Sequence, residues 1–324
     1  MTLRSAPTFF SFPADAEAHG SEAAAVIAGL TADAPSVSPK YLYGPLGSRL
    51  FDAITELPEY YPTRTERALL QACRDSVAHA AGPAPTLIDL GAGNCEKARS
   101  LFQSLKPGQY VAVDISVDFL RQSLSQLQRD FPEIEMLGIG IDFSSGLRLP
   151  DAVRRDNRLF FYPGSSIGNF TPEQALAFLA GIRAQCAGAY GGGLLIGVDL
   201  VKPEALLQAA YDDALGVTAA FNLNLLNNLN ALIGSDFAVG DWRHHALFNS
   251  AASRIEMHLE ARRDISVHWR GGARAFWQGQ RIHTENSYKY ALPDFKSLLA
   301  KAGFSRVSAW TDANDWFALC HAVL

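Results

Sequence analysis

Residues 86–94 read TLIDLGAGN, and this stretch decides the fold. The apolar run Thr86–Leu90 predicts a buried strand, and Gly91 and Gly93 predict a tight turn into a helical pattern that begins at Glu96. Glycine lets the backbone approach a ligand that any side chain would obstruct. A strand, a glycine turn and a helix are therefore typical of a nucleotide-type site. A turn that binds no ligand and needs glycine only for its own backbone geometry would show the same sequence pattern.

The same alternation of strand-like and helix-like segments continues beyond this stretch. Apolar runs predict strands at 86–90, 110–115, 135–141, 158–162 and 193–200, and amphipathic runs predict helices at 96–105, 117–131 and 172–187. Thr171, as N-cap, and Pro172, at the first helical position, mark the start of the third helix. Strands that alternate with helices of this length predict βαβ units and a parallel, doubly wound α/β sheet.

The chain leaves this pattern after residue 200. The later segments predict helices within 203–234, a β-hairpin at 253–270, a helix at 292–302 and two antiparallel strands at 306–312 and 315–322. The last two strands would complete a seven-stranded sheet. We therefore expect two domains, a nucleotide-binding domain of residues 61–200 and 286–324 and an added substrate-binding domain of residues 1–60 and 201–285.

The composition is that of an ordinary globular protein, with 324 residues, of which 48% are hydrophobic and 19% charged. The net charge of -5 and the lack of a basic stripe disfavour nucleic acid as a partner. No apolar run approaches the roughly 18 residues of a membrane helix, and the start lacks the pattern of an export signal, so we expect a cytoplasmic protein. The four cysteines are scattered, and His244 and His245 would point to opposite faces of a strand, so we expect reduced thiols and no metal site.

Three carboxylates narrow the class of nucleotide. Asp114 ends the next strand-like run, about twenty residues beyond the glycine turn, where it could accept hydrogen bonds from both ribose hydroxyls. An NAD site would use the same features, but Glu96 stands where the dinucleotide motif has its third glycine, and a carboxylate there would repel a pyrophosphate. Asp142 could accept from an adenine amino group beside an apolar wall at Phe143, or it could cap a turn. A nucleoside without phosphates fits better, which favours S-adenosylmethionine.

Longer strings are spread over nearly the whole chain. They are KYLYGPLGSRLF at 40–51, LPEYYPTRTE at 57–66, LIDLGAGNCEKAR at 87–99, GSSIGNF at 164–170, DLVKPEALLQAAYDDALGVTAAFN at 199–222, RIEMHLEARR at 254–263 and HTENSYKY at 283–290. Together they resemble the histidine-specific Nα-methyltransferases of ergothioneine biosynthesis. The resemblance implies a class I methyltransferase fold, a Rossmann-like doubly wound sheet with an added substrate-binding domain. It also implies three methyl transfers from S-adenosylmethionine to the α-nitrogen of histidine, which give hercynine.

The resemblance also assigns roles to individual positions. The family's cofactor positions match Tyr43, Gly91, Lys97, Asp114, Asp142 and Phe143. The positions that hold the amino acid match Tyr60, Asn169 and Tyr211, those that read the imidazole match Glu285 and Ser287, and Phe51 and Met257 fall on wall positions of the same pocket.

The chemistry of these residues is suited to such roles. Asn169 offers a donor and an acceptor to an amino acid, Tyr211 can donate to its carboxylate, and Tyr60 can bind its amine. Glu285 and Ser287 lie two apart, so in an extended chain they share a face and could contact both nitrogens of an imidazole. Two alternatives remain: Asn169 could cap the nearby helix, and Glu285 and Ser287 could be exposed on an edge strand.

Methyl transfer needs an uncharged amine, whereas free α-amino groups are largely protonated at neutral pH. No His or Lys of these motifs lies at an obvious base position, so we expect Tyr60 and Asn169 to orient the amine while water removes the protons. Ser165 and Asn286 depart from residues common in the family, which keeps open a different amino acid or a biogenic amine as substrate. A non-catalytic sensor is the alternative from another class. In either case we expect a monomer that binds a small amino-acid-like molecule.

Overall fold

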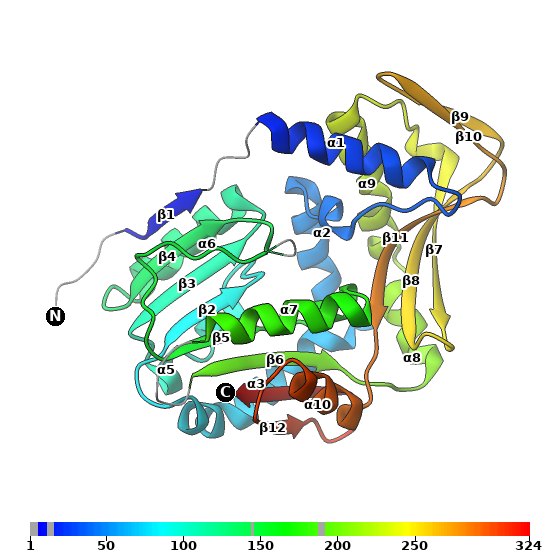
Figure 1. Ribbon diagram of the computed structural model, residues 1–324. Coiled ribbons are helices and arrows are strands. Elements are labelled where there is room, and N and C mark those ends of the chain that lie inside the picture. The colour runs from blue at the N-terminus through cyan, green and yellow to red at the C-terminus, as the bar shows by residue number, and fades with distance from the viewer. Residues whose placement is uncertain (1–5, 12–15, 144–145, 187–191) are drawn as a thin grey trace. The chain divides into compact units, whose positions relative to one another are not determined.

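The computed structural model describes residues 6–11, 16–143, 146–186 and 192–324 (Figure 1). The chain forms two compact units. Unit 1 consists of Met1–Phe12, Pro62–Val201 and Lys289–Leu324, and unit 2 consists of Pro13–Tyr61 and Lys202–Tyr288. Each unit is therefore built from segments that lie far apart in the sequence.

Unit 1 contains an eight-stranded sheet with the strand order β1-β4-β3-β2-β5-β6-β13-β12. The strands are β1 (Thr8–Ser11), β2 (Thr86–Leu90), β3 (Gln109–Asp114), β4 (Glu135–Gly140), β5 (Arg158–Tyr162), β6 (Gly193–Asp199), β12 (Arg306–Thr311) and β13 (Phe317–Val323). The strands from β1 to β6 pair in parallel, whereas β13 runs antiparallel to both β6 and β12. The predicted doubly wound sheet is confirmed, and its seven predicted strands are present.

Strand β1 is an eighth strand that the sequence analysis missed. It pairs with β4 at the edge of the sheet, where Phe9 lies opposite Gly138. A side chain at Gly138 would come within 2.4 Å of the Phe9 ring, so this glycine leaves room for the ring. The assignment of all of residues 1–60 to the substrate-binding domain was therefore wrong for this strand, because its four residues are too few to show a sheet partner.

Helices cover both faces of this sheet, as Figure 1 shows. The helices α3 (Tyr61–Ala81), α4 (Glu96–Arg99), α5 (Phe102–Leu105) and α6 (Val117–Asp130) pack on one face, and α7 (Pro172–Gln185) and α10 (Leu292–Lys301) pack on the other. Successive strand residues alternate between two buried cores, with Leu87 in the first and Ile88 in the second. The central strands β2, β3, β5 and β6 are mostly apolar because both faces of the sheet are covered.

Two of the predicted helices end differently from the prediction. The segment 96–105 is broken into α4 and α5, since the Ser100 hydroxyl donates to the Lys97 carbonyl at 2.6 Å and Leu101 bonds back only three residues, to Ala98. Helix α7 ends at Gln185, and the predicted continuation to residue 187 lies outside the described residues. Its start is confirmed, because Thr171 caps the helix in a reciprocal capping box with Gln174.

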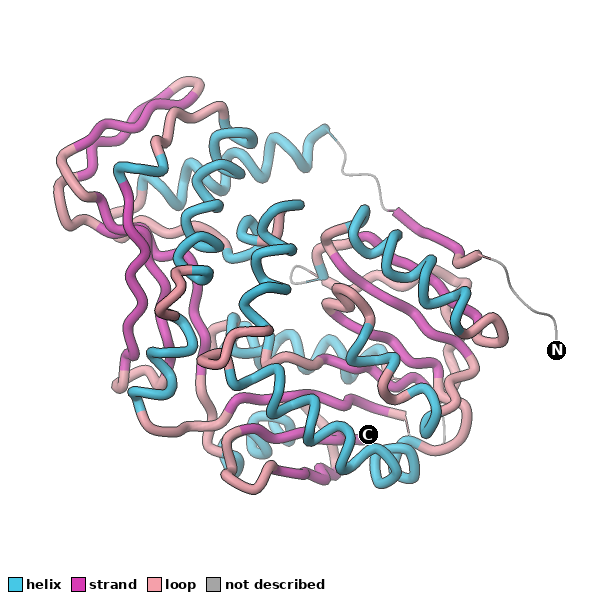
Figure 2. Tube along the Cα trace, turned by 180° about the vertical axis from the view of Figure 1, so that it is seen from behind, coloured by secondary structure: helices cyan, strands magenta, loops and turns pink. Residues whose placement is uncertain are grey.

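Unit 2 combines helices with two small antiparallel sheets. The helices are α1 (Ala16–Thr31), η1 (Pro39–Leu42), α2 (Pro45–Thr55), α8 (Glu204–Tyr211), α9 (Val217–Ile233) and η4 (Val239–Asp241). One sheet has the order β11-β8-β7, formed by β7 (Trp242–Asn249), β8 (Arg254–Ala261) and β11 (Arg281–Tyr288). The other is a ribbon of β9 (Ile265–Trp269) and β10 (Gly272–Phe276), which extends beyond the first sheet in both views (Figures 1 and 2).

The predicted hairpin at 253–270 was wrong in its pairing. Both strands exist as β8 and β9, but β8 lies between β7 and β11, while β9 pairs with β10. Alternating polar and apolar residues indicate that a segment is a strand, but they do not identify its partner.

Two further properties bear on the sequence analysis. All four cysteines are free, and burial raises the pKa of Cys95 and of Cys320 to about 12, which leaves these thiols unreactive. None of the helices in the described parts of the chain combines the length and the apolar character that crossing a bilayer requires.

Candidate active site

The glycine turn lies at the carboxyl end of β2. Gly91 and Gly93 have φ angles of +73° and +51°, which side chains rarely adopt. The N–H groups of Gly91 and Ala92 donate to the Val113 carbonyl at 2.8 and 3.1 Å, so the turn is tied to the end of β3. A side chain at Gly93 would meet no atom within 4 Å. The backbone of the turn is therefore open on the side where a ligand could approach.

Asp114 ends β3 beside this turn. Its two carboxylate oxygens accept from the N–H groups of Gly93, at 2.9 Å, and Ser116, at 2.8 Å. Burial raises the pKa of Asp114, although these hydrogen bonds oppose the shift. The carboxylate is thereby held in a fixed orientation at the end of β3, where it can face the hydroxyls of a ribose. The residues at this position are therefore suited to S-adenosylmethionine.

Asp142 and Phe143 follow β4 at the same edge of the sheet. The Phe143 ring lies 5.9 Å from that of Tyr162 in an edge-to-face contact and 6.0 Å from that of Phe178. A side chain at Gly91 would come within 4.0 Å of Phe143, so this ring faces the glycine turn. Gly91, Asp114, Asp142 and Phe143 thus lie at or just beyond the carboxyl ends of the parallel strands β2, β3 and β4.

Lys97 lies in α4 and pairs with a residue to which the sequence analysis gave no role. Its Nζ is 2.7 Å from Oε2 of Glu66, whose side chain is fully buried. The other carboxylate oxygen, Oε1, accepts from the N–H of Gly164 at 2.8 Å. The only sign of Glu66 in the sequence was its place at the end of the LPEYYPTRTE string.

Asn169 lies in η3 (Ser166–Asn169), on the loop that follows β5. The N–H of Asp199 donates to the Ser165 hydroxyl at 2.9 Å, which ties this loop to β6. Ser165 has a φ angle of +57°, a backbone conformation that few side chains adopt. The cap of helix α7 is Thr171, so the alternative role of Asn169 as that cap is excluded.

In unit 2, five rings form an aromatic cluster: Tyr43, Phe51, Tyr60, Tyr211 and Phe221. The ring centroid of Tyr60 lies 6.1 Å from those of Phe51 and Tyr211. Tyr43 lies 5.5 Å from Phe51 and 5.4 Å from Phe221. Tyr43, which was predicted to bind cofactor, thus belongs to unit 2 and contacts two of the rings. Phe221 lies within a string that supported the resemblance, but the sequence analysis gave it no role.

The hydroxyl of Tyr211 joins this cluster to strand β11. It lies 2.7 Å from the hydroxyl of Ser287, and both residues are buried. The Tyr211 carbonyl accepts from Nε2 of His244 at 2.8 Å, while Nδ1 of His244 accepts from the Asn222 amide at 2.9 Å. Burial lowers the pKa of His244. A neutral imidazole that carries its proton on Nε2 satisfies both of these hydrogen bonds. His244 therefore fixes the end of α8, where Tyr211 lies.

A β-bulge sets the direction of Glu285 and Ser287. His283 pairs with His258 and Glu285 pairs with Met257, so Thr284 is an extra residue on β11. In a regular strand Glu285 and Ser287 would lie on the same face as His283. The extra residue places them on the opposite face, beside Met257. Both side chains are buried, which excludes the alternative of exposed residues on an edge strand.

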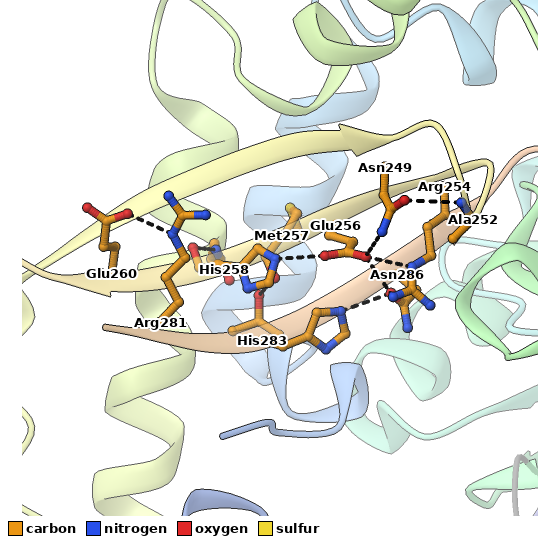
Figure 3. Close-up of polar contacts among 12 residues, drawn as sticks. Asn249, Ala252, Arg254, Glu256, Met257, His258, Glu260, Arg281, His283 and Asn286 are labelled. Carbon is orange, nitrogen blue, oxygen red and sulfur yellow. Dashed lines mark hydrogen bonds and ion pairs between the residues drawn. The ribbon is translucent and has the colours of Figure 1, made fainter. Parts of the chain in front are cut away.

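The other face of this sheet carries a row of charged and imidazole side chains (Figure 3). Burial would raise the pKa of Glu256, but hydrogen bonds from Asn249, Arg254 and His258 outweigh it and lower the pKa to about 2. Burial lowers the pKa of His258 to about 4, and Nε2 of His283 donates to Oδ1 of Asn286 at 2.9 Å. These contacts join β7, β8 and β11 and fix their register.

Three of these side chains, His245, His258 and His283, form a row across the sheet, with ring centroids 6.4 and 5.2 Å apart. Within the ranges that the structure describes, however, no three His, Cys, Asp or Glu side chains are grouped so that they could hold a metal ion. The row is therefore part of the contacts between strands.

Comparison with known proteins places these features in context. A family model described as "Histidine-specific methyltransferase, SAM-dependent" matches residues 22–324. The histidine N-alpha-methyltransferase of Mycolicibacterium smegmatis is 39% identical over 307 residues, covering 92% of this chain and 93% of that protein. That of Mycobacterium tuberculosis is 39% identical over 303 residues, covering 91% and 92%. Ergothioneine biosynthesis protein 1 of Neurospora crassa is 32% identical, covering 88% of this chain and 33% of that protein.

Among solved structures, the CcbJ methyltransferase from Streptomyces caelestis aligns with a TM-score of 0.46 and 13% identity, covering 84% of this chain and 96% of that one.

Proposed function

Because the chain belongs to the family of histidine-specific, S-adenosylmethionine-dependent methyltransferases, we propose that it methylates the α-nitrogen of L-histidine in ergothioneine biosynthesis. The observation that carries this substrate is the buried pair Glu285 and Ser287, which share one face of β11 beside Met257. A carboxylate on this buried face can accept a hydrogen bond from an imidazole N–H.

The imidazole would bind between these two side chains. Glu285 accepts one ring N–H, and the Ser287 hydroxyl meets the other ring nitrogen. The Ser287 hydroxyl is held in place by a 2.7 Å hydrogen bond with the hydroxyl of Tyr211. The single N–H of an indole can meet only one of these two side chains, which favours histidine over tryptophan.

Unit 1 would hold the cofactor. When bound, S-adenosylmethionine supplies an electrophilic methyl group on its sulfonium. Asp114 accepts from the ribose hydroxyls, Asp142 accepts from the adenine amino group, and Phe143 packs against the base. The Lys97 ammonium binds the carboxylate of the methionine part. Tyr43 is a further cofactor residue on the strength of the family resemblance alone.

We propose in addition that methylation proceeds to the trimethylated betaine, hercynine. Tyr60 and Asn169 orient the amine, and water takes the one proton that must leave the nitrogen before each of the three transfers. The support for repeated transfer comes from the aromatic cluster, since ring faces attract methylated ammonium groups by cation–π interaction. A site lined by Phe51, Tyr60 and Tyr211 would keep a partly methylated amine bound as well as the starting one.

Calorimetry tests the substrate directly. Histidine, tryptophan, tyrosine and histamine would be titrated separately into the protein saturated with S-adenosylhomocysteine. We expect histidine to bind most tightly, because only histidine offers both an imidazole and a carboxylate. Equal or tighter binding of any of the other three would refute the histidine assignment in favour of another amino acid or a biogenic amine.

A further inference from the structure

Glu66 connects two segments of unit 1 that carry proposed site residues. It lies in α3, and its side chain is 0% exposed. One carboxylate oxygen is 2.7 Å from Nζ of Lys97, on the helix that follows the glycine turn. The other accepts from the N–H of Gly164, 2.8 Å away, on the loop that leads to Asn169. A single buried carboxylate thus contacts both segments.

The surrounding backbone provides space for this carboxylate. A side chain at Gly197 of β6 would lie 2.2 Å from Oε1 of Glu66, so any other residue would displace it. A side chain at Gly164 would lie 3.1 Å from Nζ of Lys97, and Gly164 has a φ angle of +77°. Gly197 within β6 and Gly164 after β5 therefore leave room for the ion pair.

The ion pair is asymmetric in its exposure. The Lys97 side chain is 34% exposed, whereas the Glu66 side chain is fully buried. An ammonium has three N–H donors, and the contact with Glu66 occupies one direction. The carboxylate therefore fixes the ammonium from the inside, and the outer side of Lys97 remains accessible to an anionic group.

We propose that Glu66 is a positioning residue, which holds Lys97 toward the cofactor's carboxylate and anchors the loop that carries Asn169. The inference rests on the proposed function, in which Lys97 binds the cofactor. Glu66 itself touches neither cofactor nor substrate and acts through Lys97 and Gly164.

A double-mutant cycle tests this role. The dissociation constant of S-adenosylhomocysteine would be measured by calorimetry for wild type, Lys97→Met, Glu66→Gln and the double variant. We expect Lys97→Met to weaken binding by roughly ten-fold or more, the loss of one charge-assisted hydrogen bond. Glu66→Gln keeps an acceptor for Gly164 but loses the charge that holds Lys97, so it should weaken binding several-fold. The double variant should bind no more weakly than Lys97→Met, because Glu66 acts through Lys97.

The possible failures are distinguishable. If Lys97→Met binds S-adenosylhomocysteine as wild type does, the proposed cofactor role of Lys97 is wrong. If Lys97→Met weakens binding but Glu66→Gln does not, or if the two losses multiply in the double variant, only the role of Glu66 is overturned. In steady-state kinetics, Glu66→Gln should raise KM for S-adenosylmethionine by a larger factor than it lowers kcat, whereas a loss of folded protein would lower the apparent kcat alone.

Two further variants complete the design. Glu135→Gln removes an ion pair of similar length, in which Glu135 lies 2.6 Å from Arg154 in the same unit, and it should bind S-adenosylhomocysteine as wild type does. If Glu66→Gln does not fold, Gly197→Ala keeps the charge but displaces the carboxylate, and the same cycle with Lys97→Met applies. Wild-type affinity in a folded Gly197→Ala protein would equally overturn the proposal.

Discussion

Under the proposed function, Glu285 carries the choice of substrate at the scale of single residues. It is buried on the same face as Ser287, and its charge is complementary to an imidazole N–H. A neutral amide in its place would keep the shape but lose a charge-assisted hydrogen bond, which contributes about 1.5–3 kcal/mol.

We therefore expect Glu285→Gln to raise KM for histidine by roughly ten- to a hundred-fold. Its affinity for S-adenosylhomocysteine should remain that of wild type, since the proposed ribose and adenine contacts come from unit 1. Steady-state kinetics and calorimetry measure the two quantities. An unchanged KM for histidine would show that Glu285 does not read the imidazole.

A second residue-scale prediction concerns stability. Asp89 is fully buried in β2, and burial raises its pKa to about 7, although the Tyr110 hydroxyl donates to it at 2.8 Å. The folded protein therefore holds this proton more tightly than the unfolded chain. The stabilising effect is complete below the ordinary pKa of 3.8 and is lost as the pH rises through 7.

The temperature at the midpoint of thermal unfolding should accordingly decrease in wild type as the pH rises from about 5 to about 7.5. In Asp89→Asn, which keeps an acceptor for Tyr110, it should fall less over the same range. Calorimetric scans of both proteins measure the difference. Parallel pH profiles would mean that Asp89 does not titrate in this window.

Single residues were predictable where the signal is local. Gly91 and Asp114 could be identified because a turn and the end of the next strand stand close together in the sequence. Glu66 could not, since its partners Lys97 and Gly164 come from later segments of the chain. His244 was considered only as a metal ligand, whereas its partners, the Tyr211 carbonyl and the Asn222 amide, come from two different helices.

At the scale of elements, the bulge in β11 decides which face of the sheet carries Glu285 and Ser287. The sequence analysis predicted that Glu285 and Ser287 share a face, which is confirmed. It could not predict which face, because an extra residue in one strand shows only against its partner. The same limit produced the wrong hairpin at 253–270, where the strands were identified but their partners were not.

Deletion of Thr284 tests the bulge. Without the extra residue, Glu285 follows His283 directly, and successive residues of a regular strand point to opposite faces. Glu285 and Ser287 should therefore keep their face beside Met257, and histidine binding should persist. Binding of S-adenosylhomocysteine, which we assign mainly to unit 1, should persist and serves as the control for folding. Thr284→Ser, which keeps the residue count and the hydroxyl that donates to the Met257 carbonyl at 3.0 Å, should bind histidine normally. Loss of histidine binding in a deletion variant that still binds S-adenosylhomocysteine would contradict this assignment of faces.

At the scale of the whole molecule, the two units carry different parts of the proposed chemistry. Gly91, Lys97, Asp114 and Asn169 belong to unit 1, and the aromatic cluster and β11 belong to unit 2. The sheet of unit 1 was predictable because βαβ units repeat one local pattern. The sheets of unit 2 were less predictable, since β11 pairs with β8 across the intervening ribbon of β9 and β10. The expectations of a monomer and of a cytoplasmic location stay predictions. Light scattering, which measures the molar mass in solution, would check the monomer.

The central claim is that this molecule trimethylates the α-nitrogen of histidine, and mass spectrometry of its products tests that claim most directly. Purified protein would be mixed with S-adenosylmethionine and L-histidine and sampled over time. We predict species heavier than histidine by one, two and three methyl groups, all on the α-nitrogen by fragmentation, with the trimethylated species accumulating. Histidine that remains unmodified, or that stops at one methyl group while S-adenosylmethionine is still in excess, would contradict the account.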